Sequence, residues 1–265
     1  MSERSANTSG PTLVNVLIVL PPSETQAWPE SGAGLDLAGL SFPELTSARG
    51  QVLDAMVRTS RLPDAVRRLD APAGAAAEVA RNVGVWTAPT VAAGRLYRGV
   101  LYAAFDPATL AREAARRVVI VSSLFGALRL SDRVPAYRLG ICARLDGLEA
   151  PGLEAFWRGR LGPVLTDAAG DGVVVDLRSS SYTPVWRPGP ELAGRWVLLR
   201  VPGSPHAAKA ARGRVARLLS EEPEEPRDVT EVAAVVGAAF DVELHAPARA
   251  RAPWMLDVRA VAPVR

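Results

Sequence analysis

Three apolar stretches of the sequence end in hydroxyl-bearing residues. They read "LIVLPPSET" (17–25), "VVIVSSLFGALR" (118–129) and "VVVDLRSSSY" (173–182). In the sheets of α/β proteins, ligands bind beyond the carboxyl ends of the strands, where loops converge. We therefore expect the three strand ends to open toward one cleft. The candidate ligand-binding residues there are Ser23, Ser122, Ser123, Ser180 and Tyr182. The alternative is that each serine only caps a turn or a helix.

Lys209 is the single lysine among 31 basic residues. Lysine offers a compact ammonium group, whereas arginine offers a planar fork. On a helix that starts near residue 206, Lys209 and Arg212 lie one turn apart on the same face, beside the small residue Gly213. This arrangement would let a phosphate approach two cations closely. The alternative is an ordinary amphipathic helix with a solvated basic side.

A second basic group follows the middle one of the three stretches. Arg129 comes after a loop of glycine and small residues, and Tyr137 and Arg138 lie shortly downstream. A guanidinium fork together with backbone N–H groups is suited to holding an anion. These three residues are therefore candidate ligand-binding residues. Their alternative role is in salt bridges to Asp132 or Asp146.

Four more residues complete the candidate site. Tyr97 could stack on a base, and Gly99 would give a ligand close access to the backbone; the alternative is a turn between apolar segments. Glu24 is the only carboxylate in its motif, so it is a candidate general base, with His206 as its acid–base partner. The alternatives are an ion pair for Glu24 and a solvated position near a helix N-terminus for His206.

The sequence lacks the short motifs of several enzyme classes. It has no phosphate-binding G-x-x-x-x-G-K-[ST] loop, no dinucleotide-binding G-x-G-x-x-G after a strand, no G-x-S-x-G elbow and no H-E-x-x-H. Two histidines and one cysteine cannot by themselves make a usual metal site, and a single cysteine cannot form an intramolecular disulfide. We therefore expect no cofactor and no metal.

Composition limits the partners and the location. The net charge of +3 is too small to imply nucleic acid by itself. No apolar run approaches the roughly 18 residues of a membrane span. The first run, "LVNVLIVL", also lacks the basic start and cleavage site of a signal peptide. We expect a cytoplasmic protein with no membrane partner.

Hydrophobic periodicity predicts strands alternating with helices. The expected strands are 13–20, 118–121, 172–177, 195–201 and, as a closing edge strand, 255–261. The expected helices are 43–70, 74–83, 107–117, 151–169, 206–220 and 229–240, and Asp106 with Pro107 fits a helix start. Residues 1–12 are expected to form a flexible tail. Residues 13–265 are expected to form a single mixed α/β domain with a basic cleft at the strand ends.

Several motifs, taken in order along the chain, resemble the YaaA family of peroxide-stress proteins. The resemblance runs from about Leu13 to Val261. It rests on "LPPSET", "LYRGVLYAAFDPATL", "VVIVSSLFGALRLSDRVPAYRL", "FW" at 156–157, "VVVDLRSSSYTPVW" and "KAARGR". The resemblance implies a mixed α/β fold with a basic cleft and a helix-hairpin-helix-like element. It also implies binding of double-stranded DNA and protection against peroxide and iron-driven damage.

The sequence departs from the family pattern close to the expected cleft. Gln26 stands where the family commonly has lysine, and Ala207 and Ala208 stand where it often has phenylalanine and asparagine. Three functions therefore stay open. The first is a DNA-associated stress protein that binds duplex DNA weakly and without sequence preference. The second is an enzyme acting on a nucleotide-like or phosphorylated small molecule, such as a hydrolase or lyase that cleaves an N-glycosidic bond. The third is a scaffold for a protein partner.

Overall fold

The computed structural model describes residues 16–259. Its centre is a seven-stranded sheet in the order β4-β3-β1-β6-β7-β9-β8, and β2 and β5 form a second, antiparallel pair. This arrangement confirms the predicted single mixed α/β domain. The strands are β1 (Val16–Leu20), β2 (Thr90–Ala92), β3 (Val118–Ser122), β4 (Gly126–Leu128), β5 (Arg133–Pro135), β6 (Val173–Asp176), β7 (Trp196–Arg200), β8 (Asp241–His245) and β9 (Trp254–Arg259).

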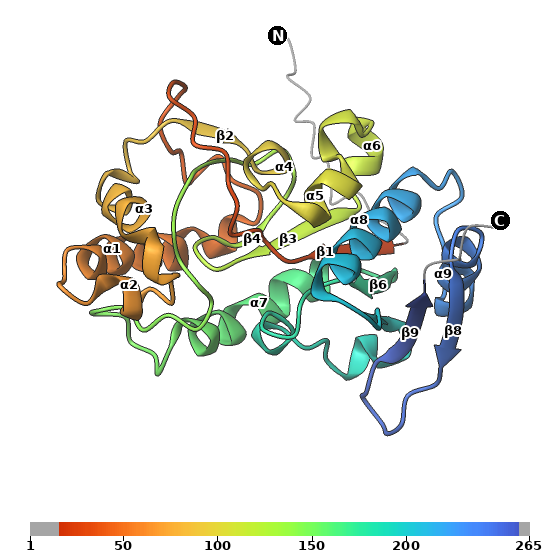
Figure 1. Cartoon of the computed structure of the whole chain (residues 1–265). Coiled ribbons are helices and arrows are strands. Elements are labelled where there is room, and N and C mark those ends of the chain that lie inside the picture. Colours follow the sequence, from red (N-terminus) through yellow and green to blue (C-terminus); the bar gives the residue numbers. More distant parts are fainter. Residues whose placement is uncertain (1–15, 260–265) are drawn as a thin grey trace, which may run out of the picture.

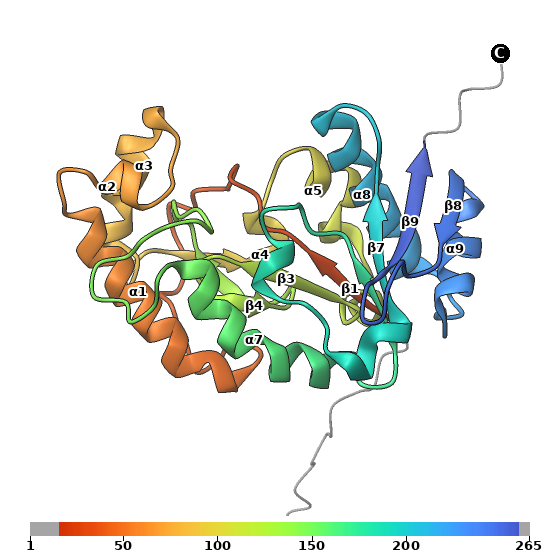
Figure 2. The same cartoon turned by 90° about the horizontal axis from the view of Figure 1, so that it is seen from below.

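Helices cover both faces of the large sheet. Helices α5, α6 and α8 lie on one face and α7 lies on the other (Figures 1 and 2). Helices α1 to α3 gather beside the β4 end of the sheet, and α9 lies beside β8. None of the helices within residues 16–259 combines the length and the apolar character that crossing a membrane requires. The helices are α1 (Thr46–Ser60), α2 (Ala65–Arg68), α3 (Ala76–Arg81), α4 (Ala93–Leu96), α5 (Val100–Phe105), α6 (Arg112–Ala115), α7 (Leu153–Ala169), α8 (Pro205–Glu221) and α9 (Val229–Gly237).

Strand β1 lies between β3 and β6 and runs parallel to both. Ile18 is aligned with Val118 on one side and with Val175 on the other. Every residue of β1 is buried, as a continuous apolar run predicts for a strand that is covered on both faces. Because the three strands are parallel, their carboxyl ends meet at one edge of the sheet. The predicted convergence of the three hydroxyl-rich strand ends is therefore confirmed.

Two predicted helices are interrupted. The region 43–70 holds α1 and the four-residue α2, separated by a turn, instead of one helix. The region 107–117 begins with a 3-10 turn at Pro107–Thr109, and the extended backbone of Leu110 and Ala111 separates this turn from α6. Asp106 does precede the turn, but its carboxylate accepts a hydrogen bond from the Thr109 hydroxyl (2.9 Å) and caps no backbone N–H.

The prediction that the last strand closes the sheet is wrong. Strand β9 pairs with β7 in parallel and with β8 in antiparallel fashion, so the unpredicted β8 is the outer strand. The three-residue strands β2, β4 and β5 were also not predicted. The predicted tail at 1–12 lies outside the described residues. So do the first residues of the predicted strand 13–20 and the last residues of the predicted strand 255–261.

Charged side chains lie along both outer strands of the large sheet. At β4, the buried Arg49 of α1 donates hydrogen bonds to the carbonyl oxygens of Phe125 (3.0 Å) and Ala127 (2.7 Å). Burial lowers the pKa of Arg49 to about 10, so the guanidinium stays charged at neutral pH. At β8, the exposed Asp241 and Glu243 alternate with half-buried residues along the strand.

The contact between α8 and α5 depends on Gly213. A Cβ atom at this position would lie 2.2 Å from the Leu101 carbonyl oxygen and 2.9 Å from the Ala104 Cβ atom. The small residue therefore lets two helices approach each other closely. The sequence prediction that Gly213 makes room for a phosphate is wrong, because α5 occupies that space.

Substituting Gly213 should therefore destabilise the fold. We expect Gly213→Ala to lower the free energy of unfolding by about 1–3 kcal/mol, the typical cost of overpacking. Gly50→Ala on α1 is the matched control, because nothing lies within 4 Å of a Cβ added there. The control should be neutral or stabilising by up to about 1 kcal/mol, since alanine favours a helix interior over glycine. Urea denaturation of both variants measures this. Equal stability of the two variants would contradict the packing argument.

Candidate functional site

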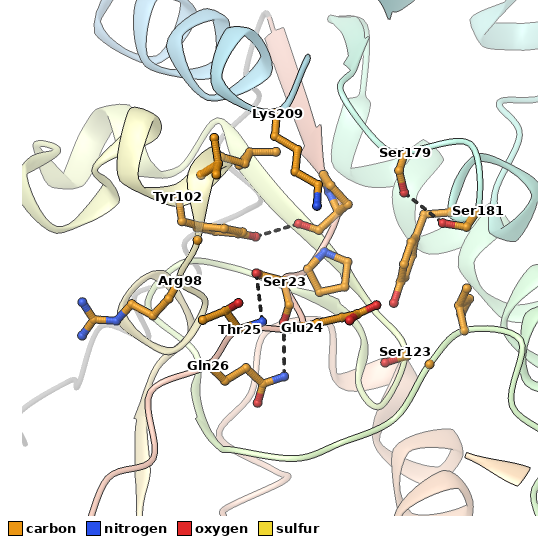
Figure 3. A pocket seen from close by; sticks show the side chains of 18 of the residues that line it. Ser23, Glu24, Thr25, Gln26, Arg98, Tyr102, Ser123, Ser179, Ser181 and Lys209 are labelled. Atoms are coloured by element: carbon orange, nitrogen blue, oxygen red, sulfur yellow. Dashed lines mark hydrogen bonds between the residues drawn. The ribbon is translucent and has the colours of Figure 1, made fainter. Parts of the chain in front are cut away.

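A cavity of about 650 Å³ opens where the ends of β1, β3 and β6 meet. The start of α8 and the start of α5 contribute to its wall, together with the segment that follows β5 (Figure 3). The residues that line it are 21–26, 98–102, 137–142 and 179–182, with Asp70, Pro72, Ser123, Pro205, Ala208, Lys209 and Arg212. This volume lies within the usual range for small-molecule sites, about 300–1,000 Å³.

Most of the site residues predicted from the sequence lie on the wall of this cavity. They come from separate elements that the parallel strands bring together. The predicted residues on the wall are Ser23, Glu24, Gly99, Ser123, Tyr137, Arg138, Ser180, Tyr182, Lys209 and Arg212. Their roles as ligand contacts remain predictions.

Tyr97 and Ser122 lie behind the wall. Tyr97 is 1% exposed and its hydroxyl lies 2.9 Å from the Tyr137 hydroxyl. Ser122 is fully buried, with its hydroxyl 2.8 Å from the same Tyr137 oxygen. A base cannot stack on a ring that is buried in this way. The predicted stacking on Tyr97 is therefore wrong.

Arg129 and His206 do not line the cavity either. Arg129 donates a hydrogen bond to the carbonyl oxygen of Arg116 (2.6 Å), and its guanidinium lies 5.1 Å from the centre of the Phe42 ring. Burial lowers the pKa of Arg129, against the opposing effect of Asp132. His206 is exposed in the first turn of α8. The predicted acid–base pair of Glu24 and His206 is thus not assembled around the cavity.

Lys209 and Arg212 are the cations that α8 presents to the cavity. Helix α8 begins with Ser204, whose hydroxyl accepts a hydrogen bond from the Ala207 N–H (3.2 Å), and with Pro205 in its first turn. This start fixes the face on which the two cations lie. Lys209 is exposed and extends from α8 toward the chain segment after β1 (Figure 3).

Arg212 is half-buried and has an unused donor. Within residues 16–259 its buried Nε atom has no hydrogen-bond partner. Burial lowers the pKa of Arg212, and the Asp176 carboxylate acts in the opposite direction. Neither Arg212 nor Lys209 forms an ion pair in the described part of the chain, so both cations are available to an anion in the cavity.

The two other cations on the wall differ in their surroundings. Arg138 is bound by the Glu78 carboxylate through its Nε atom (2.5 Å), and its backbone is held by Asn82. Arg98 is exposed, and its side chain points away from Lys209 and Ser123 (Figure 3). Of the predicted contacts, Arg138 is therefore already neutralised within the fold.

A buried ion pair holds the hydroxyl-rich segment after β6. Asp176 and Arg178 are both completely buried and lie 2.7 Å apart. Arg178 also donates to the carbonyl oxygens of Tyr182 (3.0 Å) and Trp186 (2.7 Å). These bonds fix the path of the chain that carries Ser179 and Ser181, whose hydroxyls lie 3.0 Å apart. Sequence reasoning missed both charged residues, although an Asp and an Arg inside an apolar run had to find buried partners.

Gln26 connects two walls of the cavity. Its side-chain oxygen accepts a hydrogen bond from the Tyr137 N–H (2.9 Å), and its amide donates to the Ser23 carbonyl oxygen (3.4 Å). The sequence had suggested only that Gln26 replaces a cation. In the fold, this residue holds the segment after β1 against the segment after β5.

The carboxylates of the cavity are Glu24 and Asp70. The Glu24 side chain is 81% exposed and lies 4.0 Å from Arg138. Asp70 has a left-handed backbone (φ 53°), and its carboxylate accepts a hydrogen bond from the Cys142 N–H (3.2 Å). No sequence signal pointed to Asp70 or Cys142, because a contact across 72 residues brings them together.

Elsewhere in the described residues, Glu243, His245 and Asp257 come close enough to one another to hold a metal ion. Both oxygens of Asp257 accept hydrogen bonds from Arg200, however, at 2.5 Å each. The guanidinium already supplies the counter-charge, so this group is an ion-pair network on β7, β8 and β9. None of the three residues lines the cavity.

A sequence model of the family described as peroxide stress protein YaaA matches residues 16–243. The chain belongs to this family. The YaaA match agrees with the similarity to full-length relatives. A UPF0246 protein of Streptomyces coelicolor is 41% identical over 258 residues, which cover 92% of this chain and 98% of the relative. A UPF0246 protein of Corynebacterium efficiens is 36% identical, with coverages of 87% and 96%, and one of Corynebacterium glutamicum is 35% identical, with coverages of 84% and 93%.

Cys142 is the only cysteine in the sequence, so its reactivity can be measured without other thiols interfering. Burial and the neighbouring Asp70 carboxylate raise the pKa of the Cys142 thiol. Because the thiolate is the reactive form, Cys142 should react slowly with alkylating reagents at neutral pH. We expect Cys142 to react with iodoacetamide more slowly than free cysteine at pH 7. The rate should rise steadily between pH 7 and pH 9, as the thiolate fraction grows.

The variant Asp70→Asn tests whether the Asp70 charge slows the reaction of Cys142. It removes the negative charge and keeps a side chain that tolerates the left-handed backbone. The variant should label faster than the wild type at pH 8, and Cys142→Ala should not label at all. Fast labelling of the wild type at pH 7, unaffected by Asp70→Asn, would show that the thiol is activated.

Proposed function

We propose that this YaaA-family protein serves the peroxide-stress response in the cytoplasm by binding a nucleotide unit in the strand-end cavity. The phosphate is held by Lys209 and Arg212. The observation that carries the proposal is that both cations reach the cavity without forming an ion pair in the described residues, and that the buried Nε atom of Arg212 has no hydrogen-bond partner there. An incoming phosphate therefore has no ion pair to break.

The two cations suit different parts of a phosphate contact. Arg212 is half-buried, and a partly desolvated guanidinium gains more from an anion than a fully hydrated one does. Lys209 is exposed and adds a compact charge at the mouth. Hydroxyls of Ser23 and Ser180 on the same wall offer neutral hydrogen bonds to the sugar or the phosphate, whereas the Ser123 hydroxyl already donates its proton to the Leu139 carbonyl oxygen (2.8 Å).

The nucleotide has two possible sources, a free molecule or one unit of a nucleic acid. A volume of about 650 Å³ suits one nucleotide and excludes a whole duplex. The exposed Arg98 at the mouth could contact the backbone of a longer strand outside the cavity. This residue is the feature that favours the weak, non-specific DNA association implied by the family resemblance.

Turnover of the bound ligand is the second candidate function. Glu24 lines the cavity and is the carboxylate from which an N-glycosidic cleavage or another hydrolytic step would start. Its predicted partner His206 is not on the wall, and the Glu24 side chain is mostly exposed. Binding therefore has more support than catalysis. Chromatography of nucleotides incubated with the protein detects any cleavage.

The decisive residue for the proposal is Lys209. We expect Lys209→Ala to weaken the binding of nucleoside 5′-monophosphates by about 1.5–3 kcal/mol, the range for a hydrogen bond to a charged group. Lys209→Arg should restore part of this affinity, because a planar fork reproduces a compact charge only imperfectly. Isothermal titration with AMP, GMP, CMP and UMP, beside the matching nucleosides, measures both effects. The unphosphorylated nucleosides should bind weakly to every variant.

Arg214→Ala is the matched control, since Arg214 is an exposed cation on the same helix that does not line the cavity. Its affinity and melting temperature should match those of the wild type, and Lys209→Ala should melt normally as well. Equal losses for Lys209→Ala and Arg214→Ala would reduce the effect to the general charge of α8.

If the bound nucleotide is a unit of DNA, the affinity for DNA should depend strongly on salt. Gel shifts with a duplex and with a single strand of the same sequence should show weak binding at low salt that fades toward physiological salt, because phosphate contacts release counter-ions. Arg98→Ala should weaken the binding of DNA more than it weakens the binding of AMP, because the Arg98 side chain points away from Lys209. No binding of DNA at low salt would leave the free nucleotide as the ligand, and DNA binding that does not depend on salt would contradict phosphate contacts as its basis.

A further inference from the structure

Tyr137 belongs to a cluster of three buried hydroxyl groups at the cavity wall. It lines the cavity but is only 2% exposed, and its ring packs edge-on against Phe125 at a centroid distance of 5.9 Å. Its hydroxyl oxygen lies 2.9 Å from the Tyr97 hydroxyl and 2.8 Å from the Ser122 hydroxyl. Each contact is a hydrogen bond, so the remaining question is which group donates.

The backbone decides the direction of the bond from Ser122. The Ser122 oxygen accepts hydrogen bonds from the N–H groups of Leu124 (3.2 Å) and Phe125 (3.1 Å). A serine hydroxyl has two acceptor lone pairs and one proton. Both lone pairs are therefore occupied, and the proton of Ser122 is donated to Tyr137.

Burial decides the direction of the bond from Tyr97. Burial raises the pKa of the Tyr97 hydroxyl, so this group keeps its proton. The Ser122 oxygen has no lone pair left for that proton. If Tyr137 donated to Tyr97, the Tyr97 proton would be left without an acceptor among the described residues, which is costly for a buried group. Tyr97 therefore donates to Tyr137.

From this geometry we infer that Tyr137 donates its own hydroxyl proton into the cavity, to an uncharged acceptor atom of the ligand. With the donors assigned in this way, the Tyr137 oxygen receives both hydrogen bonds, and its own proton is left without a partner in the described part of the chain. Accepting two bonds also polarises the O–H group and strengthens it as a donor.

The position of Tyr137 defines what kind of ligand atom it contacts. Gln26, whose side-chain oxygen accepts a hydrogen bond from the Tyr137 backbone N–H, lies across the cavity from Lys209 (Figure 3). The inference rests on the proposed function, in which the phosphate is held at α8. The end of the ligand that reaches Tyr137 is then the base or the sugar, and the contact selects a carbonyl oxygen or an unprotonated ring nitrogen over an amino group.

The first test compares two matched variants. Tyr137→Phe and Tyr97→Phe each remove one hydroxyl from the same buried cluster and keep the ring. Tyr137→Phe should weaken AMP binding about three- to tenfold, whereas Tyr97→Phe should change it less than twofold. Both variants should lose some thermal stability, so melting temperatures are recorded with the titrations. Equal affinity of wild type and Tyr137→Phe, with Lys209→Ala still impaired, would overturn the inference and leave the proposed function standing.

The second test needs no ligand. In a neutron diffraction map of the deuterated protein, the Tyr97 deuteron should point at the Tyr137 oxygen, and the Tyr137 deuteron should point into the cavity. A Tyr137 deuteron directed at Tyr97 would overturn the inference even if AMP binds. If no nucleotide binds to the wild type, the proposed function fails, and the neutron map still decides whether the cavity presents this donor.

Discussion

The parallel alignment of β1 with both β3 and β6 is the constraint on which the site depends. Three chain segments far apart in sequence end at one edge of the sheet because their strands run in one direction. An antiparallel partner at either position would send one hydroxyl-rich end to the opposite edge. The helices then fill the remaining wall, with Gly213 setting how closely α8 approaches α5.

The basic side chains discussed above fall into two groups with different roles. Arg178, Arg138 and Arg49 are neutralised or hydrogen-bonded inside the fold, where they hold the segment after β6, the segment after β5 and the outer strand β4. Lys209 and Arg212 have no such partners in the described residues. In a chain with a net charge of only +3, this distribution matters more than the total. It leaves two cations without an ion pair where the hydroxyl groups converge.

The parts of the fold that could be predicted from the sequence have a local cause. The apolar runs of β1 and β3 indicate buried strands, and Ser204 and Pro205 suit a helix start. What escaped prediction depends on distant partners: β4 has three residues and exists through its pairing with β3. Gln26 likewise gains its role from Tyr137, 111 residues away. Tyr97 and Tyr137 were both predicted as ligand contacts, and only tertiary packing places Tyr97 behind the cavity wall.

Charged groups lie at both outer strands of the large sheet, which bears on how the protein behaves at high concentration. An exposed edge is a template on which a second chain can add a strand and begin an aggregate. Arg49 occupies the carbonyl oxygens of Phe125 and Ala127 that such a strand would need at β4. At β8, an added strand would have to lie beside the exposed Asp241 and Glu243, which are 3.8 and 3.6 Å from Arg259. Charged side chains thus make intermolecular sheet growth less favourable, most directly at β4.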